Sequence, residues 1–172
     1  MGYNTRAGTE SGAGYGAAGT WPAYWIAVVR VLTGWWFFHA GFTKLLEGGL
    51  TFDPSGYLQG MAGTVLAPVG TTLAGYPGII GPMVVIFETL IGLALIVGLL
   101  TRFASFGGVM FMTMFWIGNA EYAHGVVNSD FMGLLLFTTI IVFGAGRYYG
   151  LDSIVERTDL VQGAPRLKYL LG

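Results

Sequence analysis

Three ionisable side chains lie within long apolar stretches of the sequence: Arg30, His39 and Glu88. Ionisable groups are costly inside a membrane, and those found there usually pair with each other, transfer protons or bind ligands. A guanidinium binds anions, whereas a carboxylate and an imidazole can exchange protons. We therefore predict Glu88, Arg30 and His39 as the catalytic candidates.

The helical periodicity of the first apolar stretch separates two faces, at about 100° per residue. Arg30 falls on a face with Thr33, Gly34, Phe37, Gly41 and Lys44. The two glycines indicate that this face packs against another helix. A permanently charged Arg30 needs a partner there, so we predict an ion pair between Arg30 and Glu88. Lys44 and His39 are the alternative partners of Glu88, and a purely structural role in helix register is an equally favoured interpretation of the pair.

The opposite face of the same stretch is aromatic, and it includes Trp35, Trp36 and His39. Such a stripe is typical of lipid and core packing, but it would also suit the flat ring of a quinone. Trp35, Trp36 and Lys44 are therefore candidate cofactor-binding residues. The alternative for His39 is an interfacial histidine beside aromatic side chains.

A second polar group lies between the third and fourth apolar stretches. Its members are Asn119, Glu121, His124, Asn128 and Asp130. Asn119 and His124 are further candidates for cofactor binding, with solvated loop residues as the alternative. Two histidines at no recognised spacing do not predict a metal site.

These side chains require membrane-spanning helices to position them. The chain of 172 residues is 54% hydrophobic and 10% charged, against about 25% charged residues in a soluble domain. We predict an all-α fold, an integral membrane four-helix bundle over residues 22–150. Its spans are residues 24–43, 79–100, 103–119 and 131–146, because each is a continuous apolar run of about the length needed to cross a bilayer.

The distribution of Lys and Arg predicts the orientation of the bundle. Six of the eight basic residues fall on one side, which places both termini in the cytoplasm. The members of that set are Arg6, Arg102, Arg147, Arg157, Arg166 and Lys168. The turn at Thr101 and Arg102 then lies inside as well.

Three segments outside the spans have distinct compositions. Residues 1–21 are rich in Gly, Ala, Ser and Thr, which predicts a disordered tail. The long outer segment 45–78 contains apolar pieces that we expect to be ordered against the ends of the helices. Residues 151–172 form an amphipathic cytoplasmic segment, in which LDSIVERTDL predicts a short helix with Asp152 or Ser153 as its N-cap.

Composition also excludes several functions. The absence of cysteine rules out thiol relays and thiolate-bound metals, so any redox chemistry belongs to a bound cofactor or a partner. A net charge of -1 provides no basic field for nucleic acid, which we do not expect as a partner.

The order of small and charged residues resembles the DoxX/DoxD family. The pattern runs from residue 22 to residue 155 and comprises Arg30, Gly34, His39, Gly41, Lys44, Glu88, Gly92, Leu95, Gly98, Leu99, Thr101, Arg102, Trp116, Asn119, His124, Gly125, Gly146, Arg147, Tyr148, Leu151 and Asp152. The resemblance implies a four-helix membrane protein that crosses the plasma membrane of a prokaryote several times. Its DoxD member is the small subunit of thiosulfate:quinone oxidoreductase, which works with a second subunit, DoxA.

Two functions follow as hypotheses. The first is a membrane redox subunit that binds a membrane quinone, or a partner that reduces quinone, within the lipid bilayer. The second is a non-catalytic scaffold or assembly subunit of a larger membrane complex. Either predicts a second protein subunit as a partner, and self-association into a homo-oligomer stays open.

Overall fold

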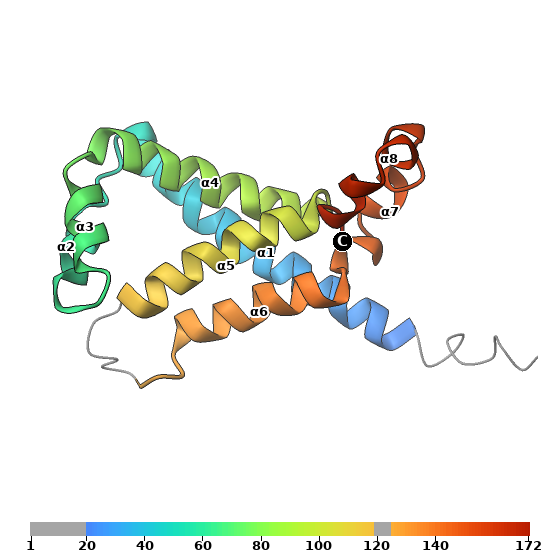
Figure 1. Cartoon of the computed structure of the whole chain (residues 1–172), viewed down its shortest axis with the longest axis horizontal. Coiled ribbons are helices and arrows are strands. Elements are labelled where there is room, and N and C mark those ends of the chain that lie inside the picture. The colour runs from blue at the N-terminus through green and yellow to red at the C-terminus, as the bar shows by residue number, and fades with distance from the viewer. Residues whose placement is uncertain (1–19, 119–124) are drawn as a thin grey trace, which may run out of the picture.

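The computed structural model describes residues 20–118 and 125–172, and this part of the chain is helical without any strand (Figure 1). The all-α prediction is therefore confirmed. The α-helices are α1 (Thr20–Gly48), α2 (Ser55–Gly60), α3 (Ala67–Ala74), α4 (Pro77–Val97), α5 (Thr101–Gly118), α6 (Ser129–Phe143), α7 (Asp152–Val155) and α8 (Asp159–Gly163). Short 3-10 helices are η1 (Gly49–Thr51), η2 (Met61–Gly63), η4 (Ala145–Arg147) and η5 (Pro165–Tyr169).

The four long helices, α1, α4, α5 and α6, share one hydrophobic core. Helix α1 packs mainly on α4, and α5 packs mainly on α6. The buried side chains of the core come from all four helices and include Phe37, Ile91, Leu95, Met112, Phe137 and Ile140. Within the described residues, α4 alone meets the length and hydropathy expected of a membrane span, and α6 is apolar but shorter.

The packed face of α1 is the one predicted from its glycines. Its buried residues are Ala27, Arg30, Thr33, Gly34, Phe37 and Gly41. A Cβ on Gly34 would lie 2.8 Å from the Cβ of Leu95, and one on Gly41 would lie 2.6 Å from the backbone nitrogen of Thr89. Neither glycine therefore leaves room for a side chain, and α1 and α4 approach each other through their backbones.

The turn between α4 and α5 lies three residues earlier than predicted. Gly98 ends α4 in the left-handed conformation, with φ +70°, which glycine adopts without strain. Thr101 and Arg102, which the prediction placed in the turn, already belong to the first turn of α5. The shift has a tertiary cause, because the carboxylate of Asp152 accepts hydrogen bonds from the backbone N–H groups of Leu100 and Thr101.

Residues 49–76, which we call the cap, cover one end of the long helices (Figure 1). Leu58 and Met61 anchor the cap, since their side chains are 2% and 0% exposed. Met61 lies against Gly70 of the cap and Gly118 of α5. The cap is folded against the long helices, as we expected of residues 45–78, although Leu50 and Val65 within it are exposed.

The C-terminal segment differs from its prediction. In place of one helix over LDSIVERTDL, two short helices, α7 and α8, are separated at residues 156–158. Leu151 occupies the N-cap of α7, and neither Asp152 nor Ser153 does. The physical reason is that the carboxylate of Asp152 caps α5, a much longer helix, and is fully buried there.

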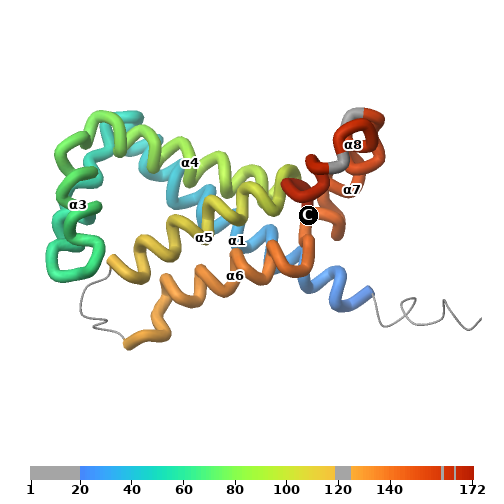
Figure 2. Tube along the Cα trace, viewed as in Figure 1, coloured from blue at the N-terminus to red at the C-terminus, as the bar shows by residue number. Residues whose placement is uncertain are grey.

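The start of α1 and the C-terminal segment lie at the same end of the molecule, opposite the cap (Figure 2). Tyr24 stacks on Tyr149 there, with ring centroids 4.8 Å apart. The predicted tail up to residue 19 lies outside the described residues, and Thr20 and Trp21 belong to α1.

Candidate functional site

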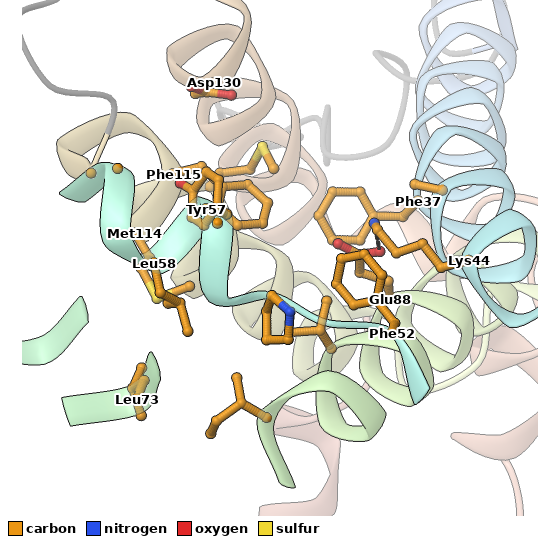
Figure 3. A pocket seen from close by; sticks show the side chains of 18 of the residues that line it. Phe37, Lys44, Phe52, Tyr57, Leu58, Leu73, Glu88, Met114, Phe115 and Asp130 are labelled. Carbon is orange, nitrogen blue, oxygen red and sulfur yellow. Dashed lines mark hydrogen bonds and ion pairs between the residues drawn. The ribbon is translucent and has the colours of Figure 1, made fainter. Parts of the chain in front are cut away.

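A cavity of about 740 Å³ lies between the cap and the ends of the long helices (Figure 3). Most of its wall is apolar. The lining side chains include Trp36, Phe37, Phe52, Tyr57, Leu58, Leu73, Ile80, Val84, Met112, Met114 and Phe115. In the part of the chain that the structure describes, its charged groups are Lys44, Glu88 and Asp130, so α1, α4 and α6 each contribute one of them.

Lys44 and Glu88 form an ion pair in the wall of this cavity. The Nζ of Lys44 lies 2.5 Å from the Oε2 of Glu88, and their side chains are 27% and 5% exposed. Gly41 makes the pair possible, because a Cβ there would lie 2.9 Å from the Cβ of Glu88. Lys44 follows Gly41 by three residues, about one helical turn, and so projects toward the carboxylate that the glycine brings close.

The ammonium of Lys44 has a second neighbour in the cap. Its Nζ lies 5.6 Å from the centroid of the Phe52 ring, a distance at which a cation is attracted to an aromatic face. The carbonyl of Phe52 in turn lies against Gly81 of α4, where a side chain would collide with it. Both the ion pair and the cap are thereby held in place by glycines on the long helices.

The predicted pair between Arg30 and Glu88 is wrong, and Lys44, the named alternative, is the partner of Glu88. The guanidinium of Arg30 instead donates hydrogen bonds to the backbone carbonyls of Ala145 (2.6 Å), Tyr148 (2.9 Å) and Tyr149 (3.2 Å). Lys44 follows Arg30 by 14 residues, or about 21 Å along a helix. The two cations therefore act at opposite ends of α1.

Trp35 and Trp36, which we predicted as quinone-binding residues, lie on different faces of α1. Trp36 lines the cavity and is 41% exposed, whereas Trp35 is 56% exposed and lies beside Phe38 and His39 away from the cavity. One residue along a helix rotates the side chain by about 100°, which suffices to send neighbours to different faces.

His39 does not line the cavity. Its side chain is exposed, and its ring centroid lies 6.2 Å from that of Trp35. Asn119 and His124, the other two candidate residues, lie outside the described residues.

Two functional groups of the cavity were missed as site residues in the sequence. We named Asp130 only as a member of the polar group between the third and fourth spans, and Tyr57 lies in the outer segment 45–78, where we singled out no residue for the site. Burial and the nearby charge of Asp130 raise the pKa of Tyr57, and its ring packs edge to face on Phe115, 5.1 Å away. Asp130 sits in the first turn of a helix, where a carboxylate is favoured for ordinary reasons, so its sequence signal was weak.

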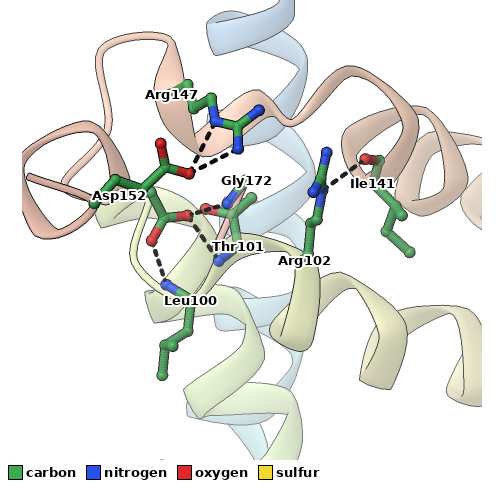
Figure 4. A network of polar contacts seen from close by, with 8 residues as sticks. Leu100, Thr101, Arg102, Ile141, Arg147, Asp152 and Gly172 are labelled. Atoms are coloured by element: carbon green, nitrogen blue, oxygen red, sulfur yellow. Dashed lines mark hydrogen bonds and ion pairs between the residues drawn. The ribbon is translucent and has the colours of Figure 1, made fainter. Parts of the chain in front are cut away.

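A second polar cluster occupies the opposite end of the molecule (Figure 4). The carboxylate of Asp152 accepts hydrogen bonds from the backbone nitrogens of Leu100 (2.8 Å), Thr101 (3.0 Å) and Gly172 (2.9 Å). Arg102 donates to the carbonyl of Ile141 at 3.3 Å. These contacts satisfy backbone groups at helix ends, so this cluster positions the helices.

An exposed ion pair borders that cluster. Nη2 of Arg147 lies 2.8 Å from Oε1 of Glu156, and this hydrogen-bonded carboxylate raises the pKa of Arg147. Exposed pairs of this kind contribute little to stability, about 1 kcal/mol or less.

Comparison with known proteins assigns the chain to a protein family. The DoxX family pattern matches residues 25–119, more than half of the chain and the part that carries Arg30, Lys44 and Glu88. This chain belongs to the DoxX family and is a membrane protein of that family, which confirms the resemblance seen in the sequence. No curated protein and no solved structure matches it.

Proposed function

We propose that this chain is a quinone-binding subunit of a membrane redox system of the DoxX/DoxD type. The observation that carries the proposal is a largely apolar, aromatic-lined cavity with an ion pair between Lys44 and the buried Glu88 in its wall. Ligand sites commonly combine such apolar walls with a few polar groups that set the orientation of the ligand.

The residues of the cavity fit the ring of a quinone. Its volume, about 740 Å³, falls within the range of about 300 to 1,000 Å³ that small-molecule sites occupy. Trp36, Phe37 and Phe115 offer ring faces and edges, and the ammonium of Lys44 has donors beyond the one that binds Glu88. A quinone supplies the capacity to accept two electrons and two protons.

The roles of the chain's own groups follow from their chemistry. Lys44 would orient a carbonyl oxygen by donating a hydrogen bond to it. Glu88 would hold and release a proton beside it, because it is the carboxylate most enclosed by the cavity wall. Trp36 would pack against the ring, and the cap would exclude water.

Electrons come from outside this chain, which contains no cysteine. In a thiosulfate:quinone reaction, two thiosulfate ions form one tetrathionate and release two electrons, which with two protons convert quinone to quinol. The membrane quinone is thus a substrate, and we propose a second protein subunit as the one that handles the sulfur compound.

We also propose that α1, α4, α5 and α6 all cross the plasma membrane as a four-helix bundle, with the ends of the chain in the cytoplasm and the cap outside. Large apolar side chains project from all four helices, as a lipid-facing surface requires. Exposed examples are Leu32 and Trp35 of α1, Leu90 and Leu93 of α4, Phe103 and Phe106 of α5, and Val142 and Phe143 of α6.

Binding is best tested by fluorescence of the protein in lipid nanodiscs, titrated with a soluble short-chain quinone. Quinones quench indole fluorescence on contact. The matched variants are Trp36→Phe, which removes an indole in the cavity, and Trp35→Phe, which removes its neighbour outside. We expect the saturable quenching to fall with Trp36→Phe and to persist with Trp35→Phe. Equal effects of the two variants, or no saturable quenching in the wild type, would contradict a quinone site in this cavity.

A scaffold function is the second candidate, and one observation favours it. Two of the most deeply buried charged groups, Arg30 and Asp152, bind backbone atoms and thereby connect α1, α5 and the segment after α6. Thiosulfate-dependent quinone reduction in membranes with and without this chain separates the two functions. A scaffold that needs no cavity would tolerate Glu88→Gln in that assay.

A further inference from the structure

We propose that Glu88 exchanges protons only with the solvent on the cap side of the membrane. Protons can reach Glu88 from one direction, because the cavity is open toward the cap and closed toward the C-terminal end of the molecule. This direction of access deepens the proposed function because it concerns the same carboxylate, but it can be tested without a quinone.

The cavity connects Glu88 with the surface at the cap. Its wall continues from Glu88 and Lys44 to Tyr57 of α2 and Asp130 of α6 (Figure 3). Tyr57 is 42% exposed, and Asp130 is half-buried. Gly56 and Gly60, which also line the wall, are exposed. Polar groups with access to water therefore lie along the same continuous space as the buried carboxylate.

The ionisable groups that face this space come from several elements. Among residues 20–118 and 125–172, they are Lys44 of α1, Tyr57 of α2 and Asp130 of α6, together with Glu88 itself on α4. The wall residues from α5 and α3 are uncharged: α5 contributes Met112, Met114 and Phe115, and α3 contributes Leu73. The segment between η1 and α2 contributes Phe52 and Pro54.

The floor of the cavity is closed by packed rings. Phe37 and Met112 line the cavity and are 3% and 2% exposed. Directly below, the ring of Phe137 meets that of Phe37 edge to face at 4.7 Å and lies against Gly108, where a side chain would collide with it. No gap for a column of water lies between rings that pack so closely.

The layer beneath the floor contains no titratable side chain that could pass a proton through it. Leu95, Ile140 and Ala104 fill it, and they are 0%, 0% and 6% exposed. The sequence contains no charged residue or histidine in residues 89–97, 103–118 and 131–143, which cover the inner parts of α4, α5 and α6. On α1, His39 lies on the outside of the helix. Two buried hydroxyls of this region are those of Thr33, which donates to the carbonyl of Val29, and of Ser105, which has no hydrogen-bond partner among the described residues.

Because of this arrangement, Glu88 exchanges protons with one side of the membrane and not with the other. A proton taken up by Glu88 comes from the cap side, and a proton released by it returns there. Arg30, beyond the sealed layer, belongs to the other compartment. If quinone is reduced in the cavity, the protons that enter through Glu88 are drawn from the cap side of the membrane.

Chemical labelling can follow the protonation of Glu88 directly. Dicyclohexylcarbodiimide crosses lipid and reacts with protonated carboxyl groups, and mass spectrometry of the peptide that contains residue 88 measures the rate. The full-length protein is placed at one copy per vesicle, and a C-terminal affinity tag separates vesicles that expose the C-terminal end from those that expose the cap. The interior stays buffered while the external solution is acidified.

We expect acidification outside to speed labelling of Glu88 in vesicles that expose the cap, by up to about tenfold for each pH unit. In vesicles that expose the C-terminal end, the rate should stay constant until a proton ionophore removes the gradient. Glu88→Gln controls for assignment of the peptide, and Glu47→Gln, on an exposed carboxylate that does not line the cavity, should retain the sidedness.

Three results would overturn the proposal: a response in the opposite set of vesicles, an equal response in both sets, or no labelling of Glu88 at any pH. Failure of quinone binding in the fluorescence titration would leave this sidedness intact. The two proposals can therefore fail separately.

Discussion

The Nζ of Lys44 and the Oε2 of Glu88 lie 2.5 Å apart, which connects α1 to α4 beside the cavity, while Arg30 of the same helix binds three carbonyls at the opposite end. The two cations of α1 thus have separate tasks. Lys44 pairs with a buried carboxylate in an apolar pocket, and Arg30 holds the segment that follows α6.

Glu88→Gln tests proton transfer at the candidate site. Glutamine preserves the shape and can still accept a hydrogen bond from Lys44, but it does not titrate. We expect the variant to fold, with a melting temperature within about 4 °C of the wild type, and to lose most of the quinone reduction measured in membranes. Glu47→Gln, on an exposed carboxylate one turn beyond Lys44, is the control. Full activity of Glu88→Gln would end the proton-transfer role.

Lys44→Met tests the ion pair itself. The substitution leaves Glu88 charged and buried without its partner, which costs about 3 kcal/mol of unfolding free energy in comparable cases, and somewhat less here because Lys44 is partly exposed. The double variant Lys44→Met with Glu88→Leu should recover most of that stability but no activity. Thermal unfolding in detergent measures the first effect, and quinone reduction the second. Recovery of activity in the double variant would indicate a structural pair.

Arg30→Lys tests the assignment of Arg30 to helix positioning. A lysine ammonium cannot span the carbonyls of Ala145, Tyr148 and Tyr149, which the planar guanidinium reaches with two nitrogens. We expect a loss of about 2 to 4 kcal/mol in unfolding free energy but unchanged quinone affinity in the protein that remains folded. A weaker affinity without a loss of stability would place Arg30 in the ligand site.

Asp152→Ala tests the role of Asp152 as hydrogen-bond acceptor at the N-terminus of α5. It leaves three backbone N–H groups without their acceptor, and we expect a cost of about 2 to 3 kcal/mol. Asp152→Asn retains one carbonyl oxygen and should fall between the alanine variant and the wild type. Asp159→Asn, at an exposed carboxylate in the first turn of α8, should change the melting temperature little. An equal effect of Asp152→Asn and Asp159→Asn would contradict the capping role.

The proposed topology has its own measurement. Reporter enzymes fused at residues 10 and 170 should report the cytoplasm, and a reporter at Gly60, within the cap, should report the outside. The physical reason is the excess of Lys and Arg near the C-terminal end of the molecule. Reporters at the two ends on opposite sides would require an odd number of crossings.

Much of the fold could be predicted because it depends on periodicity within single segments. The helices, the packed face of α1 and the ordered cap all follow from the spacing of apolar and small residues, which each segment carries by itself. The same holds for the selection of Arg30 and Glu88, since an ionisable residue within an apolar stretch is visible without a structure.

Which cation of α1 pairs with Glu88 was decided by the tertiary structure. Arg30 and Lys44 share one face of α1, and nothing in that face tells which of them lies level with Glu88. The crossing of α1 and α4 at Gly34, Gly41 and Gly92 sets their axial register, and that register brings Lys44 to Glu88. Likewise, the rotation of α1 in the assembled helices sends Trp36 into the cavity and Trp35 away from it.

The sequence alone determined the four long helices, which residues are ionisable and which face of α1 is buried, because these depend on interactions within a few turns. Only the tertiary structure decided that Asp152 caps α5, that Arg30 binds backbone carbonyls and that Asp130 and Tyr57 join Glu88 around one cavity. Those contacts join residues between 31 and 119 positions apart in the chain. Their partners are selected by the register and rotation of packed helices, which no local pattern encodes.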